Sequence, residues 1–115
     1  MEGNDLHFAV IGWGYWGPKI ARNLDSLPHV QVTFIADMDA GRLATVAEHL
    51  PLAKTTTTIA DVLWADVDGV VIATPVKTHY QLAKEALLHG KHVLVEKPLT
   101  ADVAQAEELV ALAKK

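Results

Sequence analysis

The 115-residue chain contains no cysteine, which excludes disulfide bonds and metal sites built on thiolates. It also has no excess of basic residues, because 14 acidic against 10 basic residues give a net charge of -4 at neutral pH. Nucleic acid and anionic membrane surfaces are therefore not expected partners. No uncharged apolar run approaches the length of a membrane span, and the N-terminus, MEGNDLHFAV, lacks the basic and apolar segments of a secretory signal. We expect a cytoplasmic protein.

The residues that are present predict one globular domain built from alternating strands and helices. Hydrophobic residues make up 50% of the chain and charged residues 21%, an ordinary balance for a domain with its own core. Apolar runs predict strands at 7–11, 30–36, 69–73 and 92–95, and a short strand at 53–57. Helical periodicity predicts helices at 15–27, 40–50, 77–88 and 101–114, and a short helix capped by Thr58 and ending at Trp64. The residues expected to face the core from three of these helices are Ile20, Leu24 and Leu27; Leu43, Val46, Ala47 and Leu50; and Val103, Ala106, Leu109, Val110 and Ala113.

This alternation predicts an α/β fold, a doubly wound parallel sheet of the Rossmann type with helices on both faces. The expected strand order is 3-2-1-4-5, and the ligand crevice should lie at the carboxyl ends of strands one and four, where the winding reverses. A full fold of this type has six strands, and the pattern here lacks a sixth. We therefore expect residues 1–115 to be a dinucleotide-binding domain and a fragment of a longer protein whose substrate domain is absent.

A glycine-rich turn follows the first predicted strand in the pattern G-x-G-x-x-G, formed by Gly12, Gly14 and Gly17. Its expected roles are a tight turn, close approach of a pyrophosphate to the backbone, and close packing of helix on strand. Three aromatic residues fill the pattern, Trp13, Tyr15 and Trp16, whose backbone would bind while their side chains point away. The alternative is a glycine-rich turn that binds no ligand.

Asp37 closes the second predicted strand, 20 residues after Gly17, where an acid that binds the adenosine ribose is expected. A carboxylate accepts hydrogen bonds from ribose hydroxyls and repels a 2′-phosphate, so Asp37 favours NAD over NADP. Arg42, one helical turn further, is able to receive a phosphate and weakens that preference. Alternatively, Asp37 only caps the next helix, a role that Asp39 could also take.

Other polar residues follow the fourth and fifth strands, at the same predicted edge of the sheet. Thr74 and Pro75 either line the cofactor crevice or simply end the strand. His79, in the next helix, is a further candidate for the crevice lining, and its alternative is a surface or packing role. Glu96 and Lys97 follow the fifth strand directly. A lysine near a nicotinamide can hydrogen-bond a substrate hydroxyl and transfer its proton, although a charged surface loop explains the same residues. The histidines show no metal-ligand spacing, and we predict no metal site.

Three stretches together resemble the N-terminal domain of the Gfo/Idh/MocA oxidoreductases: VIGWGYWGPKIARNL, IADMD and ATPVKTHYQLAKEALLHGKHVLVEKPLT. The resemblance covers nearly the whole chain. It implies a Rossmann domain that binds NAD or NADP, followed by an α/β substrate domain. It also implies hydride transfer between the nicotinamide and a carbon of a sugar, a polyol or, as the variant GYWG suggests, a nucleotide-linked sugar.

The resemblance further implies a role for each candidate residue. The implied roles are the pyrophosphate loop for Gly12, Gly14, Gly17 and the backbone of Tyr15 and Trp16; the ribose acid for Asp37; the crevice lining for Thr74, Pro75 and His79; the second ribose contact for Glu96; and substrate orientation with proton transfer for Lys97. The whole protein is expected to be a homo-oligomeric enzyme, and this chain alone to be inactive. The rival hypotheses are an NAD-binding sensor and an interaction module. Lys97 favours the enzyme, because a sensor needs no lysine beside the nicotinamide.

Overall fold

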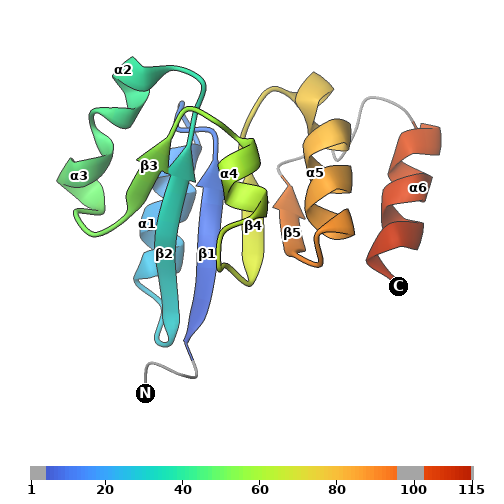
Figure 1. Cartoon of the computed structure of the whole chain (residues 1–115), viewed down its shortest axis with the longest axis horizontal. Coiled ribbons are helices and arrows are strands. Elements are labelled where there is room, and N and C mark those ends of the chain that lie inside the picture. Colours follow the sequence, from blue (N-terminus) through green and yellow to red (C-terminus); the bar gives the residue numbers. More distant parts are fainter. Residues whose placement is uncertain (1–4, 96–102, 115) are drawn as a thin grey trace.

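The computed structural model describes residues 5–95 and 103–114, which form one parallel sheet with helices packed around it (Figure 1). The strands are β1 (Leu6–Ile11), β2 (Val30–Ala36), β3 (Lys54–Thr56), β4 (Gly69–Ile72) and β5 (His92–Val95). The helices are α1 (Gly17–Asp25), α2 (Ala40–Leu43), α3 (Val46–His49), α4 (Ala60–Leu63), α5 (His79–Leu88) and α6 (Val103–Ala113), with a 3-10 turn, η2 (Val76–Thr78), before α5. None of the helices within these ranges is long and apolar enough to cross a membrane.

The sheet confirms the predicted topology. All of its strand pairs are parallel, and the order is β3-β2-β1-β4-β5. At the carboxyl end of β1, Ile11 pairs with Ala36 of β2 on one side and with Ile72 of β4 on the other. The segments that follow these three strands therefore begin side by side, although they are far apart in the sequence.

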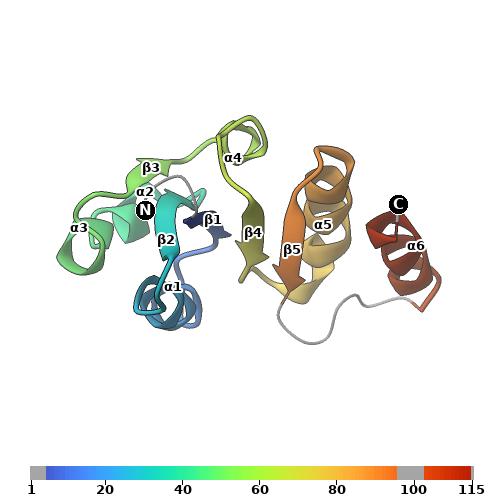
Figure 2. The same ribbon diagram turned by 90° about the horizontal axis from the view of Figure 1, so that it is seen from below.

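Both faces of the sheet are covered by helices, which explains why the central strands are apolar at consecutive positions. Val10 and Val71 face α1 and α3, whereas Ile11 and Ile72 face α4 and α5. All four side chains are buried. Figure 2 shows α1 on one side of the sheet and α4 on the other, with α6 beyond α5 at the far end.

The prediction of one continuous helix over 40–50 is wrong. The segment forms two short helices, α2 and α3, separated by Ala44 and Thr45. The Thr45 hydroxyl donates to the carbonyl oxygen of Arg42 at 2.9 Å, a local side-chain bond that competes with helix continuation. The break also changes which residues face the core. Val46 is buried as expected, but Ala47 is exposed.

The ends of two other helices differ from the prediction for equally local reasons. Helix α1 stops at Asp25, whose carboxylate accepts the backbone N–H of Val32, so Leu27 lies beyond the helix and is exposed. Thr58 does not cap the short helix with its hydroxyl. Instead, the Thr56 hydroxyl accepts the backbone N–H of Thr58 at 3.0 Å and donates to the Asp61 carboxylate at 2.7 Å.

Helix α6 buries less of its apolar face than its periodicity predicted. Leu109 is buried, whereas Val103, Val110 and Ala113 are exposed. The helix packs mainly against α5 and not against the sheet, so only one narrow stripe of its surface is covered. The predicted cap and first residues of this helix lie outside the described residues.

Candidate functional site

A cleft of about 780 Å³ opens at the carboxyl ends of β1, β2 and β4, the place predicted for the ligand. Its size lies in the range of small-molecule and cofactor sites, roughly 300–1,000 Å³. It brings together residues from the glycine turn, the end of β2 and the segment after β4. The predicted site residues that line it are Gly12, Gly14, Tyr15, Trp16, Asp37, Thr74 and Pro75.

A second cavity, of about 540 Å³, lies between β5, α5 and α6 and is the weaker candidate. Its lining is predominantly apolar and holds no carboxylate. The ammonium of Lys91, on its wall, already donates to the carbonyl oxygens of Ala65 and Val67. Among the described residues of this lining, His92 is the other polar side chain. The cleft at the strand ends brings more polar groups together and is therefore the candidate functional site.

The three glycines of the turn are required for two different reasons. Gly12 has φ +103°, and a Cβ on it would lie 2.5 Å from the carbonyl oxygen of Ala73. A Cβ on Gly17 would collide with the carbonyl oxygen of Gly12, so these two glycines are required by the fold itself. Gly14 is different, because among the described residues a Cβ there would meet only Nη1 of Arg42, at an ordinary 3.7 Å. Packing of the described residues does not explain Gly14, and the space beside it is open to the cleft that Gly14 lines.

The turn also presents unpaired donors at the start of α1. Within residues 5–95 and 103–114, the backbone N–H groups of Gly14, Tyr15 and Trp16 have no acceptor. Trp16 is the N-cap of α1 without a side-chain cap bond, and the first turn holds no acidic residue. Free N–H groups and the positive end of the helix dipole make this turn suited to an anion such as a phosphate.

Trp13 turns its side chain away from the cleft, as the sequence led us to expect. Its ring packs into the core with Val10 and Val46 and is 3% exposed. Its indole N–H donates to Oγ1 of Thr45 at 3.1 Å. Trp13 therefore anchors the turn from beneath, and its backbone rather than its ring is close to the cleft.

Tyr15 and Trp16, by contrast, form an exposed aromatic pair at the rim of the cleft. Their rings meet edge to face with centroids 4.9 Å apart. The Lys19 ammonium lies 3.9 Å from the centroid of the Tyr15 ring and 5.3 Å from that of Trp16. Such cation–π contacts hold a positive charge beside the start of α1, where it adds to the attraction for an anion.

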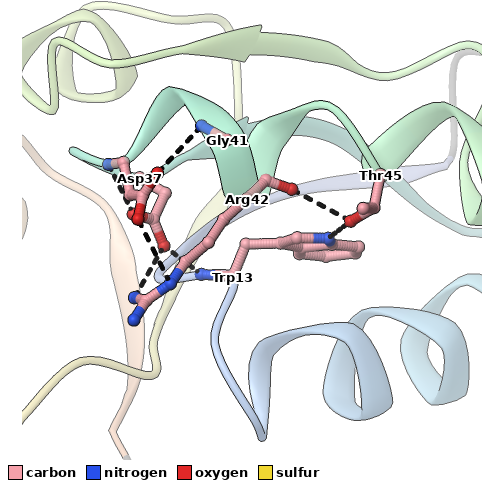
Figure 3. A network of polar contacts seen from close by, with 6 residues as sticks. Trp13, Asp37, Gly41, Arg42 and Thr45 are labelled. Atoms are coloured by element: carbon pink, nitrogen blue, oxygen red, sulfur yellow. Dashed lines mark hydrogen bonds and ion pairs between the residues drawn. The ribbon is translucent and has the colours of Figure 1, made fainter.

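Asp37 is buried, 6% exposed, and both of its carboxylate oxygens are engaged (Figure 3). Oδ2 accepts the backbone N–H of Trp13 at 2.7 Å, and Oδ1 accepts that of Asp39 at 2.8 Å. Each carboxylate oxygen has a second lone pair for a further donor, such as a ribose hydroxyl. Asp39 is the N-cap of α2, because its Oδ1 accepts the N–H of Gly41 at 2.8 Å. The alternative role for Asp37 as that cap is therefore not what the structure shows.

The segment after β4 forms a hydrogen-bonded wall opposite Asp37. The Thr78 hydroxyl donates to the carbonyl oxygen of Pro75 at 2.6 Å, which leaves the Thr74 hydroxyl to donate to Thr78 Oγ1, also at 2.6 Å. Nε2 of His79 lies 2.8 Å from the carbonyl oxygen of Thr74, and since a carbonyl only accepts, this nitrogen carries the proton. His79 is 1% exposed and is not part of the cleft lining, so it supports the wall from behind.

Several lining residues were not predicted from the sequence. They come from the segment after β2, from the residue before α4, from η2 and from the start of α5: Met38, Ile59, Lys77, Thr78, Gln81 and Leu82. Thr78 and Gln81 are three residues apart, a helical spacing that signals a shared face. Glu96 and Lys97 lie outside the described residues, and no cluster of three potential metal ligands occurs within the described part of the chain.

Residues 6–115 match the family model described as an oxidoreductase family with an NAD-binding Rossmann fold, GFO_IDH_MocA. The chain belongs to this family. It is 38% identical over 112 residues to an inositol 2-dehydrogenase of Rhodococcus jostii, with 93% of this chain and 30% of the relative covered. The structure of GenD2 from gentamicin A biosynthesis, in complex with NAD, superposes with a TM-score of 0.91 at 36% identity, covering 96% of this chain and 32% of the other.

A second solved structure is relevant to the choice of cofactor. It is a mutant of KijD10, a 3-ketoreductase from Actinomadura kijaniata, in complex with TDP-benzene and NADP. The TM-score is 0.86 at 34% identity, and the match covers 96% of this chain and 36% of the other. This chain thus spans about a third of the length of the relatives it matches. Both dinucleotides occur in complexes of proteins with this domain structure.

Proposed function

We propose that this chain is the dinucleotide-binding domain of a longer NAD-dependent oxidoreductase. The observation that carries the proposal is the cleft between a glycine turn with unpaired N–H groups and the buried carboxylate of Asp37. Both features line the same cleft, which suits the pyrophosphate and the adenosine ribose of one dinucleotide, with the pyrophosphate on the turn and the ribose on the acid. Membership of the family supports the same cofactor class.

In the proposed complex, three parts of the chain contact the dinucleotide: the glycine turn, Asp37 after β2, and the segment after β4. The N–H groups of Gly14, Tyr15 and Trp16 would receive the pyrophosphate, and Asp37 would accept the hydroxyls of the adenosine ribose. The nicotinamide half would then extend across β1 towards Thr74, because β4 lies on the other side of β1 from β2. The carboxylate of Asp37 disfavours a 2′-phosphate, and we therefore propose NAD as the preferred cofactor.

The nicotinamide, when bound, supplies or accepts the hydride. The rest of the proposed chemistry belongs to Glu96 and Lys97, which follow β5. Glu96 would contact the second ribose. Lys97 would orient a substrate hydroxyl and move its proton, which requires a pKa tuned towards the working pH.

We further propose that the substrate is a sugar, a polyol or a nucleotide-linked sugar. The inositol dehydrogenase and the TDP-benzene complex among the similar proteins support these classes. The residues that select the substrate would lie in the remaining two thirds of a protein of the relatives' length. Homo-oligomeric assembly and a cytoplasmic location stay predictions from the sequence.

The rival functions are an NAD sensor without chemistry and an interaction module with no ligand. Titration with NAD separates the interaction module from the other two. Lys97→Ala separates the sensor from the enzyme, because in the longer protein it should abolish turnover while leaving NAD binding nearly unchanged.

Gly14→Ala is the sharpest test of the proposed site. A methyl group there is compatible with the fold, since its nearest neighbour would be 3.7 Å away, but it occupies the space of a pyrophosphate. We expect NAD affinity, measured by isothermal titration calorimetry, to fall about tenfold or more, which is ~1.4 kcal/mol, with little change in thermal stability. An unchanged affinity would place the phosphate elsewhere, and no binding of NAD by the unmodified chain would refute the proposed function.

A further inference from the structure

The glycine turn has few backbone hydrogen bonds of its own to hold it in shape. Between Gly12 and Gly17, the N–H of Trp13 is the one backbone donor with an acceptor among the described residues, Oδ2 of Asp37 at 2.7 Å. The donors that follow are those proposed to bind the pyrophosphate, and Gly14 adds backbone freedom rather than restraint. A contact other than a backbone hydrogen bond therefore has to keep the turn in place beside the cleft.

The side chain of Trp13 supplies this restraint. Its ring is buried with Val10 and Val46, and its indole N–H donates to Oγ1 of Thr45 at 3.1 Å (Figure 3). Packing decides where the ring lies, and the hydrogen bond decides which way its N–H edge points, because a rotated ring would leave that donor without an acceptor. The turn is thus attached to the core through one side chain.

We propose that Thr45 is a positioning residue for the pyrophosphate, and that it acts through the indole of Trp13. The inference rests on the proposed dinucleotide site. Thr45 is not among the described residues that line the cleft, so it would not touch the ligand itself. A turn that is already held in its binding conformation loses less conformational freedom when a ligand binds, and its affinity is higher for that reason.

The hydroxyl of Thr45 is used in a way that the neighbouring helix does not explain. Thr45 is the N-cap of α3, a position where a threonine oxygen usually accepts a backbone N–H of the first helical turn. No such cap bond forms here. The hydroxyl instead donates to the carbonyl oxygen of Arg42 at 2.9 Å, and its oxygen accepts the indole N–H of Trp13. A bond to a residue 32 positions away has replaced the local cap, which favours a role in the site.

Both N–H groups of Trp13 are bound by the segment that follows β2. The backbone N–H donates to Asp37, the proposed ribose acid, and the indole N–H donates to Thr45. Loss of the Thr45 bond should loosen the turn, whereas Asp37 keeps its bond to the N–H of Asp39. The effect of losing Thr45 should therefore fall on the phosphates of a ligand and not on its adenosine ribose.

Thr45→Val tests the positioning role, because it keeps the shape of an exposed side chain and removes only its hydroxyl. In calorimetric titrations we expect NAD and ADP to bind about threefold more weakly, as for loss of one neutral hydrogen bond, and Thr45→Ser to restore both affinities. Adenosine, which lacks the phosphates, should bind with unchanged affinity in a titration followed by NMR. Thr57→Val, at an exposed threonine outside the described lining of the cleft, is the matched control.

The indole N–H signal of Trp13 reports on the hydrogen bond itself. In proton–nitrogen correlation spectra, with the signal assigned from Trp13→Phe, Thr45→Val should shift this signal and leave those of Trp16 and Trp64 in place. In the Trp13→Phe background, Thr45→Val should cause no further loss of NAD affinity, because the path from Thr45 to the turn is already broken.

Three results would overturn the inference: equal losses for adenosine and ADP, the same loss in Thr57→Val, or an effect of Thr45→Val that persists in the Trp13→Phe background. The last result would mean that Thr45 acts through its bond to Arg42. An unchanged NAD affinity in Thr45→Val, with NAD bound by the unmodified chain, would refute the positioning role alone. Binding of neither NAD nor ADP by the unmodified chain would instead refute the dinucleotide site itself.

Discussion

The carboxylate of Asp37 accepts the backbone N–H of Trp13 at 2.7 Å, so the acid at the end of β2 fastens the glycine turn that follows β1. The two residues are 24 positions apart in the sequence and follow neighbouring strands, β1 and β2. This bond gives Asp37 a structural role in addition to the proposed recognition of ribose. It also means that a substitution of Asp37 changes the shape of the turn and not only the choice of cofactor.

Asp37→Asn should therefore lower stability as well as NAD affinity. An amide has one acceptor oxygen for two buried N–H donors, and its NH₂ group would face the other donor. We expect the free energy of unfolding to fall by roughly 1–3 kcal/mol, the cost of an unsatisfied buried donor. The difference in affinity between NAD and NADP should narrow, because the charge that repels a 2′-phosphate is gone. Urea denaturation and calorimetric titration measure the two effects.

Asp39→Asn is the matched control for this substitution. Asp39 is exposed and caps α2, a position where asparagine serves about as well as aspartate. We expect stability and NAD affinity to stay near those of the unmodified chain. Equal destabilisation in the two variants would contradict the special role assigned to Asp37.

Gly12→Ala should destabilise the fold, in contrast to Gly14→Ala. The new Cβ would lie 2.5 Å from the carbonyl oxygen of Ala73, on a backbone with positive φ. Strain of this kind typically costs about 1–3 kcal/mol. Thermal denaturation of both variants measures the contrast, and a melting temperature that falls equally in both would show that Gly14 also serves the fold.

Binding of NAD should change tryptophan fluorescence mainly through Trp16. Trp16 lines the cleft, whereas Trp13 is buried beneath the turn and Trp64 meets His89 edge to face outside the lining. We expect Trp16→Phe to remove most of the change seen in a fluorescence titration and Trp64→Phe to preserve it. The reverse result would mean that the dinucleotide binds elsewhere on the chain.

The contact between α5 and α6 should weaken in acid. Hydrogen bonds from the Lys84 ammonium, at 2.9 Å, and from the Tyr80 hydroxyl, also at 2.9 Å, lower the pKa of Glu108 below its ordinary value. A carboxylate with a lowered pKa stabilises the folded state above its ordinary pKa, and this contribution is lost as the pH falls through the lowered value. The hydrogen bond with Glu108 also raises the pKa of Lys84, so the contribution of Lys84 is fully present below the ordinary lysine pKa and is lost as the pH rises through the raised value.

Glu108→Gln checks this prediction. The difference in stability between the chain and the variant, from urea denaturation over a pH series, should be present near neutral pH and vanish in acid. Because both side chains are substantially exposed, the difference should be small and should shrink further with added salt. A difference that is the same at every pH would show that packing and not charge is responsible.

Much of the fold was predictable because it depends on patterns that are local in the sequence. The apolar runs of β1, β2 and β4 are buried on both faces, and a doubly wound order follows from alternation with helices and the usual handedness of crossovers. The place of the cleft follows from that order. The predictions failed where a single side chain redirects the backbone, as Thr45 does at the break between α2 and α3.

Residue type, spacing and periodicity were enough to predict the family, the strand order and the position of the glycine turn and Asp37 at one edge of the sheet. Each of these patterns lies within a short stretch of the sequence and needs no knowledge of which elements pack together. Three other relationships are visible only in the folded chain: the space that the described residues leave beside Gly14, the hydrogen bond from the Trp13 N–H to Asp37, and the path from Trp13 through Thr45 to Arg42. These relationships join residues from separate elements. They arise from the register of parallel strands and from side-chain directions, neither of which local patterns contain.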